Sequence, residues 1–417
     1  MSVVEAGDGR ASAQRVEGIE GRELLSDITA APDPQVVYDR LRSRWGTVAP
    51  VDLEPGVPAW LVLGYDEAVG VLRNELLYSR DSRAWRYVAD RLLPRGSAAL
   101  ALLAPGDGVH HVDGAEHRRL RAPVDQALAG IDEKRLARTV AVTCDAVIER
   151  LVARGEADLV RDYAVPVSVM VLADLLGLSL ADATRMHELT DALRSGTAAA
   201  CPAAAEHENL VAATVAQHRA EPGDDLTTAL IGHADHANDL EVMGAVGATF
   251  GMGHDGEVAW VASTLYLLLA DPEFGARVRG GRLDLDGALD EVVRRYPPLP
   301  HLLPRFALQD CDLGGHRIAA GDAVVAAVAA ANADRAVRPD DPWEELGSRF
   351  HLTWGTGAHA CPAHRLGHVI SRIAVERILH RLGDAALAVP AEEITLSGSA
   401  WSRYPRSLPV RWGSGRL

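Results

Sequence analysis

One cysteine of the chain stands in a loop whose composition suits a thiolate that binds a metal. The segment FHLTWGTGAHACPAHRL, residues 350–366, places Cys361 among small residues, with His359 two positions before it and Pro362 directly after it. Glycines let backbone N–H groups approach the sulfur, and an apolar helical pattern begins just beyond the loop. Such N–H groups and the positive end of a helix stabilise negative charge on sulfur. The loop therefore predicts a lone thiolate ligand.

Three roles for this cysteine stay open on these residues alone. A lone cysteine is most often a small buried side chain of the core. The spacing of Cys361, His359, His364 and His368 also suits a zinc site. Thiolate ligation of haem iron would instead favour O–O cleavage and indicate oxygen activation. Colour separates the two metals, because a zinc site is colourless and a haem-thiolate protein is red.

The composition excludes several classes of protein. The chain has 417 residues, and its 48% hydrophobic and 24% charged content is ordinary for a globular protein. A net charge of −16 argues against general binding of nucleic acid. The cysteines show no paired spacing, so we expect free thiols and a cytoplasmic protein. The N-terminal segment lacks the apolar core of a signal peptide, and no apolar stretch is long enough to span a bilayer, so we expect no membrane attachment.

The length predicts either two domains or one large helical body. We expect residues 1–30 to form a flexible extension and residues 31–417 to form the catalytic domain. Apolar periodicity predicts a mainly α fold with small peripheral β-sheets. The expected helices cover 36–44, 65–73, most of 116–269, and about 363–382 before Gly383. The expected strands cover 59–63, then 305–313 and 316–325 around Gly314 and Gly315, and a strand pair in 394–412; residues 86–110 are expected to be a mobile loop region.

Residues 239–270 form one long apolar helical pattern with five glycines in its middle, Gly244, Gly247, Gly251, Gly253 and Gly256. Each glycine costs about 1 kcal/mol of helix stability relative to alanine. The glycines indicate either close packing of helices or room for a flat cofactor and a substrate, with a local distortion that admits water.

Four motifs in sequence order resemble those of the cytochrome P450 family. Residues 354–361, WGTGAHAC, are similar to the family's haem-binding loop, with Trp354 where Phe is usual and Ala363 where Gly is usual. Glu291 and Arg294 resemble its Glu-x-x-Arg pair, whose spacing places both charges on one helix face. The run EHRRLR, residues 116–121, and Arg305 resemble its segments that bind the haem propionates. The motifs occur in order within residues 30–415, so the resemblance does not depend on one match.

This resemblance implies the mainly α cytochrome P450 fold and haem b with Cys361 as the axial ligand. It implies a ferryl oxidant made from O₂ with electrons from a ferredoxin and its NAD(P)H-dependent reductase. Glu291 and Arg294 are implied to be structural and buried, and either Arg338 or Arg349 completes their ion network. The residues expected to contact the cofactor are His117, Arg121, Arg305, His359, Phe250, Gly253, Trp354 and Gly355.

The central helix departs from the family at one position. The family has Ala/Gly-Gly-x-acid-Thr, whereas residues 252–257 read MGHDGE, so Asp255 supplies the acid and Gly256 replaces the alcohol. That alcohol normally orders the water that delivers protons, and the nearest hydroxyl, on Thr249, lies about two turns away. Either ordered water or the substrate supplies protons, or the chemistry has moved away from oxygen insertion. The residues expected to take part in catalysis are His254, Asp255, Gly256 and Glu257.

The resemblance implies an oxidase of a small natural product in actinobacterial secondary metabolism, with hydroxylation or epoxidation as the default. The alternative is oxidative C–C or C–N coupling or cyclisation of an aromatic metabolite such as a tryptophan-containing cyclic dipeptide. A haem-binding protein without turnover is a further alternative. The expected pocket residues, each of which could equally belong to the core, are Trp85, Phe250, Leu299, His301, Leu302 and Trp401. A basic group that is either a ferredoxin-docking patch or a solvated helix face comprises Arg118, Arg119, Arg365, His368 and Arg372.

Overall fold

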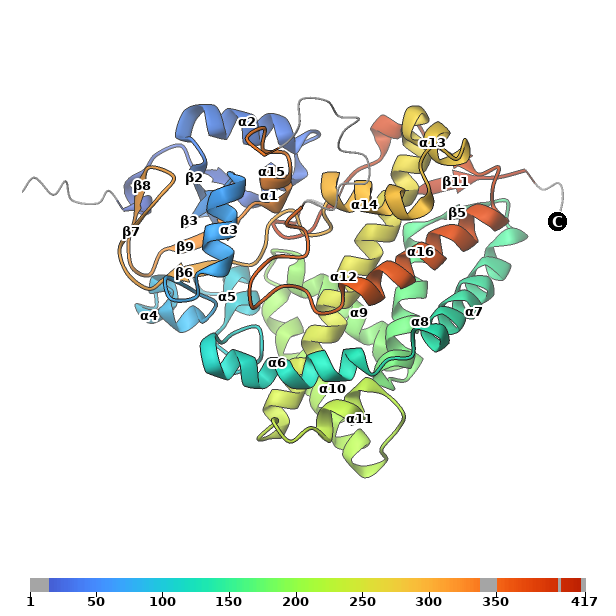
Figure 1. Cartoon of the computed structure of the whole chain (residues 1–417), viewed down its shortest axis with the longest axis horizontal. Coiled ribbons are helices and arrows are strands. Elements are labelled where there is room, and N and C mark those ends of the chain that lie inside the picture. The colour runs from blue at the N-terminus through green and yellow to red at the C-terminus, as the bar shows by residue number, and fades with distance from the viewer. Residues whose placement is uncertain (1–14, 338–350, 397–398, 414–417) are drawn as a thin grey trace, which may run out of the picture.

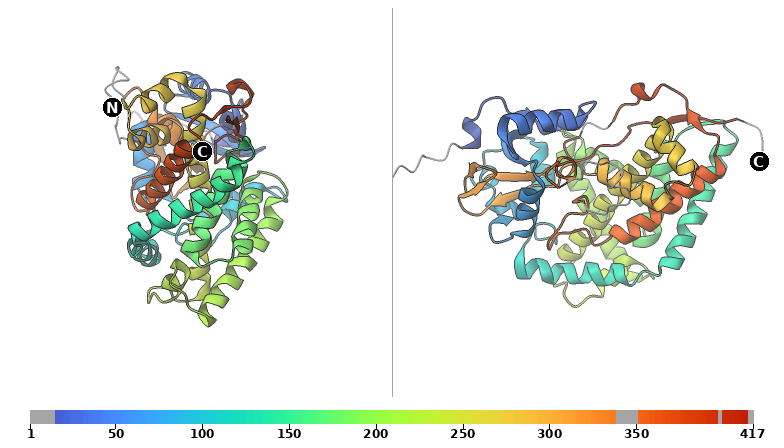
Figure 2. Two further views of the ribbon diagram at one scale, coloured as in Figure 1. Left: turned by 90° about the vertical axis from the view of Figure 1, so that its right-hand side faces the viewer. Right: turned by 45° about the horizontal axis from the view of Figure 1, so that its top comes forward.

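The structure is a computed structural model that describes residues 15–337, 351–396 and 399–413. Figures 1 and 2 show a mainly helical molecule whose larger β-sheet lies toward one end. The helices are α1 Leu25–Ala30, α2 Pro34–Trp45, α3 Tyr65–Arg73, α4 Arg86–Ala89, α5 Ala98–Leu103, α6 Gly114–Ala129, α7 Glu133–Val152, α8 Val165–Leu176, α9 Leu180–Arg194, α10 Ala200–Ala220, α11 Leu226–Ile231, α12 Asp239–Ala270, α13 Pro272–Arg279, α14 Leu285–Arg295, α15 Val328–Asn332 and α16 His364–Arg381. The strands are β1 Glu23–Leu24, β2 Val48–Glu54, β3 Val57–Val62, β4 Tyr78–Ser79, β5 Glu156–Asp158, β6 Arg305–Ala307, β7 Cys311–Leu313, β8 His316–Ile318, β9 Ala323–Ala326, β10 Ala386–Leu387 and β11 Pro409–Arg411.

The larger sheet has the strand order β1-β2-β3-β9-β6-β4. Strands β2 and β3 form an antiparallel hairpin, and β3 pairs with β9 in parallel. Alternate residues of β3 enter two different hydrophobic clusters, Ala59 and Leu61 on one face and Trp60 and Val62 on the other. Both faces of β3 are therefore buried, which explains why the strand is apolar along its whole length.

Helix α12 runs through the helical half of the molecule (Figure 1). It begins at Asn238, whose side chain accepts a hydrogen bond from the N–H of Glu241, as expected for a helix cap. It packs against α8, α10, α14 and α16, and α16 also packs against α7. The loop that contains Cys361 leads directly into α16, so α12 and this loop are held against a common partner.

Several predicted elements are confirmed, and others need correction. Helices α2, α3, α12 and α16 lie where the periodicity placed them. Each of the two strands expected around Gly314 and Gly315 is divided, giving β6 with β7 and β8 with β9. The expected loop region 86–110 contains α4 and α5. In the tail, β11 pairs with β5 and β10, and one bridge between Leu396 and Pro405 joins the tail to itself.

The expectation of a flexible extension to residue 30 was wrong for residues 15–30. Val16, Leu25 and Ile28 are all at most 1% exposed. They join the hydrophobic clusters on the two faces of the larger sheet, which gives this segment apolar contacts that its own sequence does not reveal. No single helix among the described residues combines the length and the apolar composition that a membrane crossing needs. The bent helix pair Val160–Leu176 and Leu180–Arg194 reaches that length and composition only when the two helices are taken together.

Candidate active site

The loop at residues 354–361, here called the Cys loop, is folded back on itself by its own backbone. The N–H of Cys361 donates to the carbonyl oxygen of Trp354 at 2.8 Å. Gly355 and Gly357 have φ values of +68° and +78°, which favour glycine. A Cβ atom at Gly357 would also lie 2.8 Å from the carbonyl oxygen of Leu72, so this turn cannot accept a larger residue without movement.

The sulfur of Cys361 lies at the start of α16. Burial raises the pKa of the thiol, and the backbone N–H groups of Ala363 and His364 oppose that rise by donating to the sulfur. The two N–H groups therefore favour the thiolate without outweighing desolvation. A bound cation would supply the missing stabilisation, because a coordinating thiol is deprotonated by its metal. This chemistry fits a ligand to iron.

Arg121 contacts the Cys loop, and its expected contact with the cofactor stays a prediction. Its guanidinium donates to the carbonyl oxygens of Ala358 and Ala360 at 3.2 and 2.8 Å and pairs with Asp125 at 2.6 Å. Arg121 thus joins α6 to the Cys loop through two carbonyl acceptors of the loop, and these bonds with the one to Asp125 use three of the five N–H donors of its guanidinium. The sequence could not show this, because the loop and the helix are far apart along the chain.

Three groups predicted to bind propionates do converge. Arg305 and His117 are each 2% exposed, and among the described residues the Nε and Nη1 atoms of Arg305 and Nδ1 of His117 have no hydrogen-bond partner. The rings of His117 and His359 lie 4.0 Å apart between centroids. Buried donors normally have acceptors. An anionic group such as a haem propionate would provide them, so these residues fit the cofactor.

A carboxylate holds His359 in place within this cluster. Its Nε2 atom lies 3.0 Å from Asp113 Oδ1 and 3.5 Å from Glu75. Burial lowers the pKa of His359 to about 4, although the hydrogen bond to Asp113 raises it. His359 is therefore a neutral donor to Asp113 at neutral pH, and it orients this side of the Cys loop.

The zinc alternative does not agree with the geometry. His364 Nδ1 lies 3.4 Å from the carbonyl oxygen of Cys361, and His368 Nε2 lies 3.7 Å from Asp286. Across the described parts of the chain, the one group of side chains with metal-ligand spacing is Glu75, His117 and His359, which excludes the cysteine. The predicted set of one cysteine and three histidines is therefore not assembled.

One side of α12 borders open space, and we call its residues Met252, Gly253 and Gly256 the open face. A Cβ atom at Gly256 would meet no atom within 4 Å. Met252, one turn earlier, is 42% exposed although this helix is otherwise largely buried. By contrast, a Cβ at Gly244 would lie 3.2 Å from Gly108 Cα. The glycines thus serve both of the predicted purposes, close packing near the start of the helix and room near its middle.

The four residues expected to take part in catalysis have separate environments. Asp255 is buried and pairs with Arg194 of α9 at 2.5 Å. Desolvation raises the pKa of Asp255, and Arg194 opposes the rise. Arg194 also donates to the carbonyl oxygen of Gly251 at 3.2 Å, so it is held against α12. Asp255 directly precedes Gly256 in the chain.

His254 and Glu257 contact other side chains than Asp255 does. His254 contacts Ser168 of α8 at 2.9 Å and His187 of α9 at 2.8 Å, and burial lowers its pKa to about 3. Glu257 accepts a hydrogen bond from Ser371 of α16 at 2.7 Å, and desolvation raises its pKa to about 8. His254 and Asp255 both contact α9, whereas Glu257 is bound to α16, and the part of each residue in catalysis stays a prediction.

Most of the large side chains expected in the substrate pocket belong to the core. Phe250 and Trp85 are 0% exposed, so neither faces open space; Phe250 stacks on the ring of His254, and Trp85 stacks on Phe306. His301 is 1% exposed, and its ring nitrogens contact Tyr38 Oη at 2.8 Å and the carbonyl oxygen of Ala400 at 2.9 Å.

The remaining pocket residues are two leucines and a tryptophan. Trp401 is 8% exposed and packs in the same cluster as Trp85. Leu299 and Leu302 are partly buried, and Leu302 lies 3.9 Å from the Cβ position of Gly355. Leu302 therefore contacts the Cys loop, and its place in the pocket stays a prediction together with that of Leu299.

Sequence reasoning missed two residues near the expected propionate ligands, Asp113 and His110. Asp113 accepts hydrogen bonds from Ser79 and from the N–H of Arg80 as well as His359. The Nδ1 atom of His110 is buried and has no partner among the described residues. Desolvation lowers the pKa of His110, and the neighbouring His111 and Arg80 act in the same direction. The signal was the run HHVD, residues 110–113, which two residues separate from the EHRRLR motif.

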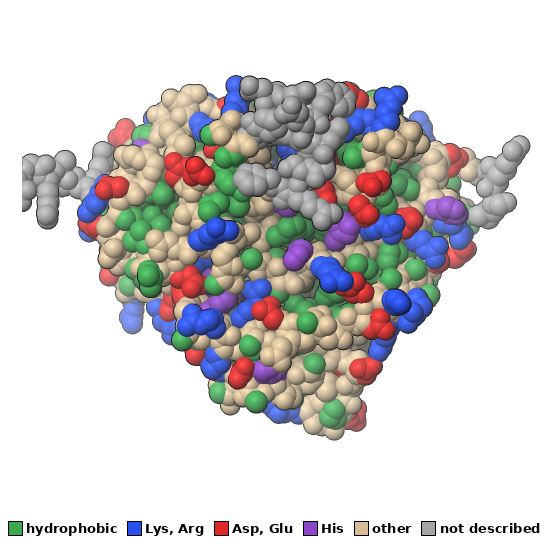
Figure 3. All heavy atoms as spheres, viewed as in Figure 1, with side chains coloured by type: hydrophobic (Ala, Val, Ile, Leu, Met, Phe, Trp, Pro, Cys, Tyr) green, Lys and Arg blue, Asp and Glu red, His purple; other side chains and the backbone are tan. Residues whose placement is uncertain are grey.

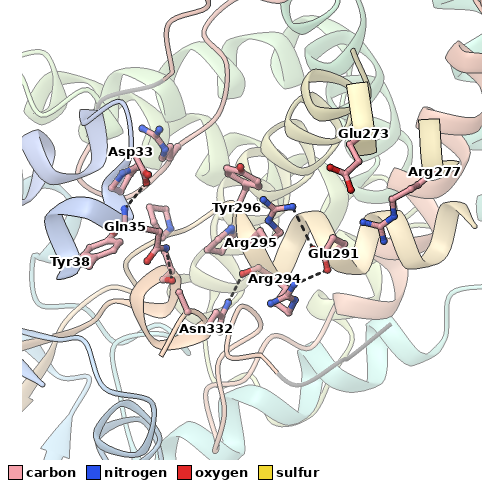
Figure 4. Close-up of a pocket in the computed structure, with 16 residues that line it drawn as sticks. Asp33, Gln35, Tyr38, Glu273, Arg277, Glu291, Arg294, Arg295, Tyr296 and Asn332 are labelled. Carbon is pink, nitrogen blue, oxygen red and sulfur yellow. Dashed lines mark hydrogen bonds and ion pairs between the residues drawn. The ribbon is translucent and has the colours of Figure 1, made fainter. Parts of the chain in front are cut away.

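Glu291 and Arg294 form the buried pair that the sequence predicted. Their side chains are 9% and 6% exposed, and the charged atoms lie 2.8 Å apart. Asn332 donates to the carbonyl oxygen of Arg294 at 3.0 Å, which ties α14 to α15. Figure 4 shows these side chains along the wall of a cavity of about 570 Å³, whose lining includes neither the Cys loop nor the open face. Arg338 and Arg349, the two candidates to complete this network, lie outside the described residues.

Comparisons with known proteins decide the family. The model of the family described as Cytochrome P450 matches residues 285–383. Cytochrome P450 monooxygenase PikC of Streptomyces venezuelae is 31% identical over 93% of this chain and 92% of its own length. This chain belongs to the cytochrome P450 family.

Other members share its length and fold. Mycinamicin IV hydroxylase/epoxidase of Micromonospora griseorubida is 28% identical over 86% of this P450 and 90% of its own length. The structure of CYP154C4 from Streptomyces sp. W2061 superposes with a TM-score of 0.84 at 27% identity and covers 94% of this chain and 97% of its own. The chain is thus a P450 monooxygenase with a haem-iron cofactor, which uses O₂, a redox partner and an organic substrate.

Proposed function

We propose that this P450 hydroxylates or epoxidises a small natural product, with haem b held by Cys361. The observation that carries the proposal is the loop of Cys361, closed on Trp354 beside buried nitrogens of Arg305 and His117 that have no hydrogen-bond partner among the described residues. The printed name of the Micromonospora relative, a hydroxylase/epoxidase, supports this reaction class. When bound, the haem supplies the activation of O₂.

The chain's own residues supply binding and protons. His117, Arg305 and the backbone of the Cys loop hold the cofactor. Asp255 has a raised pKa and lies next to Gly256 in the chain, so it is the acid best placed to feed water in the open space at Gly256. Burial raises the pKa of the carboxyl and Arg194 opposes that rise, so Asp255 holds its proton more readily than an exposed carboxyl does. Water in this space would replace the alcohol that the family usually has.

The open face also supports the second candidate function, oxidative coupling or cyclisation of an aromatic metabolite such as a tryptophan-containing cyclic dipeptide. The absence of a side chain at Gly256 removes a group that would order water, and it leaves room for a flat ring. Proton supply at the haem site would then depend on a polar group of the substrate. Removal of hydrogen from the substrate would replace oxygen insertion.

The electron donor is proposed to be a ferredoxin with its NAD(P)H-dependent reductase, working in the cytoplasm, where free thiols such as those of this chain persist. The expected docking patch has less unpaired positive charge than its sequence suggests, because several of its arginines pair with carboxylates. Arg365 pairs with Glu133 at 2.6 Å, and Arg372 pairs with Asp286 at 3.1 Å. Arg119 binds Glu241 at the start of α12. Figure 3 shows basic and acidic side chains interspersed on the face it presents.

Charge reversal tests the docking patch. Arg365→Glu and Arg372→Glu together should slow reduction by the ferredoxin and flatten the dependence of its rate on salt. An unchanged rate with an unchanged salt dependence would remove these residues from the docking site.

A ligand screen tests the reaction class. The Soret band of the ferric protein is followed with aromatic cyclic dipeptides, macrolides, fatty acids and terpenoids, and product masses are then measured. A low-to-high-spin shift with macrolides or terpenoids and a gain of one oxygen support hydroxylation or epoxidation. A shift with cyclic dipeptides and a loss of hydrogen support coupling. Absence of the haem-thiolate Soret band would overturn both.

The role of Gly256 is tested by Gly256→Thr, with Gly256→Ala as the control that adds a Cβ without a hydroxyl. A several-fold rise in turnover for the threonine variant alone, with the same product, would show that the glycine is only a weakness in proton delivery. An unchanged or lower turnover would show that water or the substrate already performs this step.

A further inference from the structure

The Cys loop carries an indole in direct contact with a second, buried indole. Trp354 lies in the Cys loop and its carbonyl accepts the N–H of Cys361, so its backbone is fixed relative to the sulfur. The ring of Trp354 is partly buried and lies 5.0 Å from that of Trp260 between centroids, at an angle of 58°. This distance is within the range of aromatic contact.

The second indole continues toward the protein surface. Trp260 lies on α12, is 2% exposed, and its Nε1–H donates to the carbonyl oxygen of Leu289 at 3.2 Å. The ring of Trp260 also contacts the ring of His368 on α16, 5.8 Å away between centroids in an edge-on arrangement. The side chain of His368 is 28% exposed. A continuous series of rings therefore runs from the Cys loop through the junction of α12 and α16 to the surface.

Indole gives up one electron far more easily than a phenyl ring, so a tryptophan pair can carry charge where a phenylalanine would not. We propose that Trp354 and Trp260 form a one-electron relay that drains oxidising equivalents from the haem site when they are not used on a substrate. The relay rests on the haem assignment and needs neither candidate reaction. An enzyme that lacks the alcohol at Gly256 has particular use for it, because poor proton delivery increases the number of unproductive cycles.

The electron balance of the relay is simple. Trp354 gives one electron to the oxidised haem site, and Trp260 then gives one electron to Trp354. The carbonyl oxygen of Leu289 is too weak a base to take the Nε1 proton of Trp260, so the oxidised ring keeps that proton as a radical cation. One electron from a thiol or from a reduced ferredoxin then restores Trp260, and no proton has to return.

The relay predicts a radical that simple packing does not. The haem-loaded full chain, without substrate, is mixed with a peracid, frozen rapidly and examined by electron paramagnetic resonance. Mass spectrometry then measures oxygen addition at each tryptophan, and the Soret band gives the rate of haem bleaching. The variants are Trp354→Phe and Trp260→Phe, which keep an aromatic ring. The control is Trp60→Phe, because Trp60 is also 1% exposed and hydrogen-bonded but packs in a separate cluster.

The expected result is a tryptophan radical in the native chain and in the Trp60 variant. Trp354→Phe should lose it and bleach several-fold faster, and Trp260→Phe should confine oxygen addition to Trp354. The relay is overturned if both variants give the native radical yield and bleaching rate. The carbonyl complex of the reduced protein is recorded for each variant. Its absence in the native chain would refute the haem assignment, whereas a normal complex without a radical refutes the relay alone. If Trp354→Phe fails to bind haem, Trp260→Phe decides the question.

Discussion

Replacing Glu257 by glutamine should stabilise this P450 more strongly as the pH rises. The carboxyl is buried between α12 and α16, where Ser371 donates to it at 2.7 Å. Desolvation raises its pKa from 4.5 to about 8. A raised pKa means that the folded state holds a proton which the unfolded state has already released, so the stability due to this group is complete below pH 4.5 and is lost as the pH rises toward 8.

The size of the effect follows from the two pKa values. One pKa unit corresponds to about 1.4 kcal/mol, so the free-energy penalty of Glu257 is about 1 kcal/mol at pH 5.5 and about 3 kcal/mol at pH 7. It levels off above the folded pKa of about 8. Glutamine keeps an oxygen that accepts the hydrogen bond from Ser371 and has no charge to desolvate. The free energy of unfolding of the variant relative to the native chain should therefore rise by about 2 kcal/mol between these two pH values.

The assay is denaturant unfolding of the haem-loaded protein at several pH values, followed by circular dichroism. Glu241→Gln is the control on the same helix, because Arg119 holds the pKa of Glu241 below its usual value, so its stabilisation is present at neutral pH and lost as the pH falls. The two variants should therefore move in opposite directions at neutral pH. A difference between Glu257→Gln and the native chain that does not change with pH would refute the reasoning.

Three further predictions concern the same region. Arg194→Ala should leave the carboxylate of Asp255 buried and unpaired, lower stability by about 3 kcal/mol and move the acid limb of the pH–turnover profile to higher pH; an unmoved limb would exclude Asp255 from proton delivery. Gly256→Ala should raise the free energy of unfolding by up to about 1 kcal/mol, since its Cβ meets no atom within 4 Å, whereas Gly244→Ala should lower it; equal effects in denaturant unfolding would contradict the open face. His301→Ala should lower the melting temperature, because it leaves buried polar partners unpaired, yet keep the spectral affinity for substrates; a selective loss of affinity would return His301 to the pocket.

The sequence by itself determined the elements whose signals are local. The Cys loop depends on glycines that can adopt positive φ and on a helix that starts just after Cys361, and both are written in adjacent residues. The bounds of α12 follow from a cap at Asn238 and an apolar pattern to Ala270. The burial of the Glu291–Arg294 pair was implied by the family resemblance and is confirmed by its exposure. Glycine turns and helix caps depend on residues that are adjacent in the chain, so the sequence is sufficient to predict them.

Only the tertiary structure decided what each side chain of the central helix contacts. An α-helix turns by about 100° per residue, so neighbouring residues face different partners. His254 meets α8 and α9, Asp255 meets Arg194, and Glu257 meets α16, although the three lie within four positions. The sequence gives their types and spacing, and it cannot say which helix packs on which side. For the same reason the sequence prediction placed Trp85 in the substrate pocket, whereas the structure buries it fully in the core. A large aromatic side chain is common in both environments, so its type alone does not distinguish them.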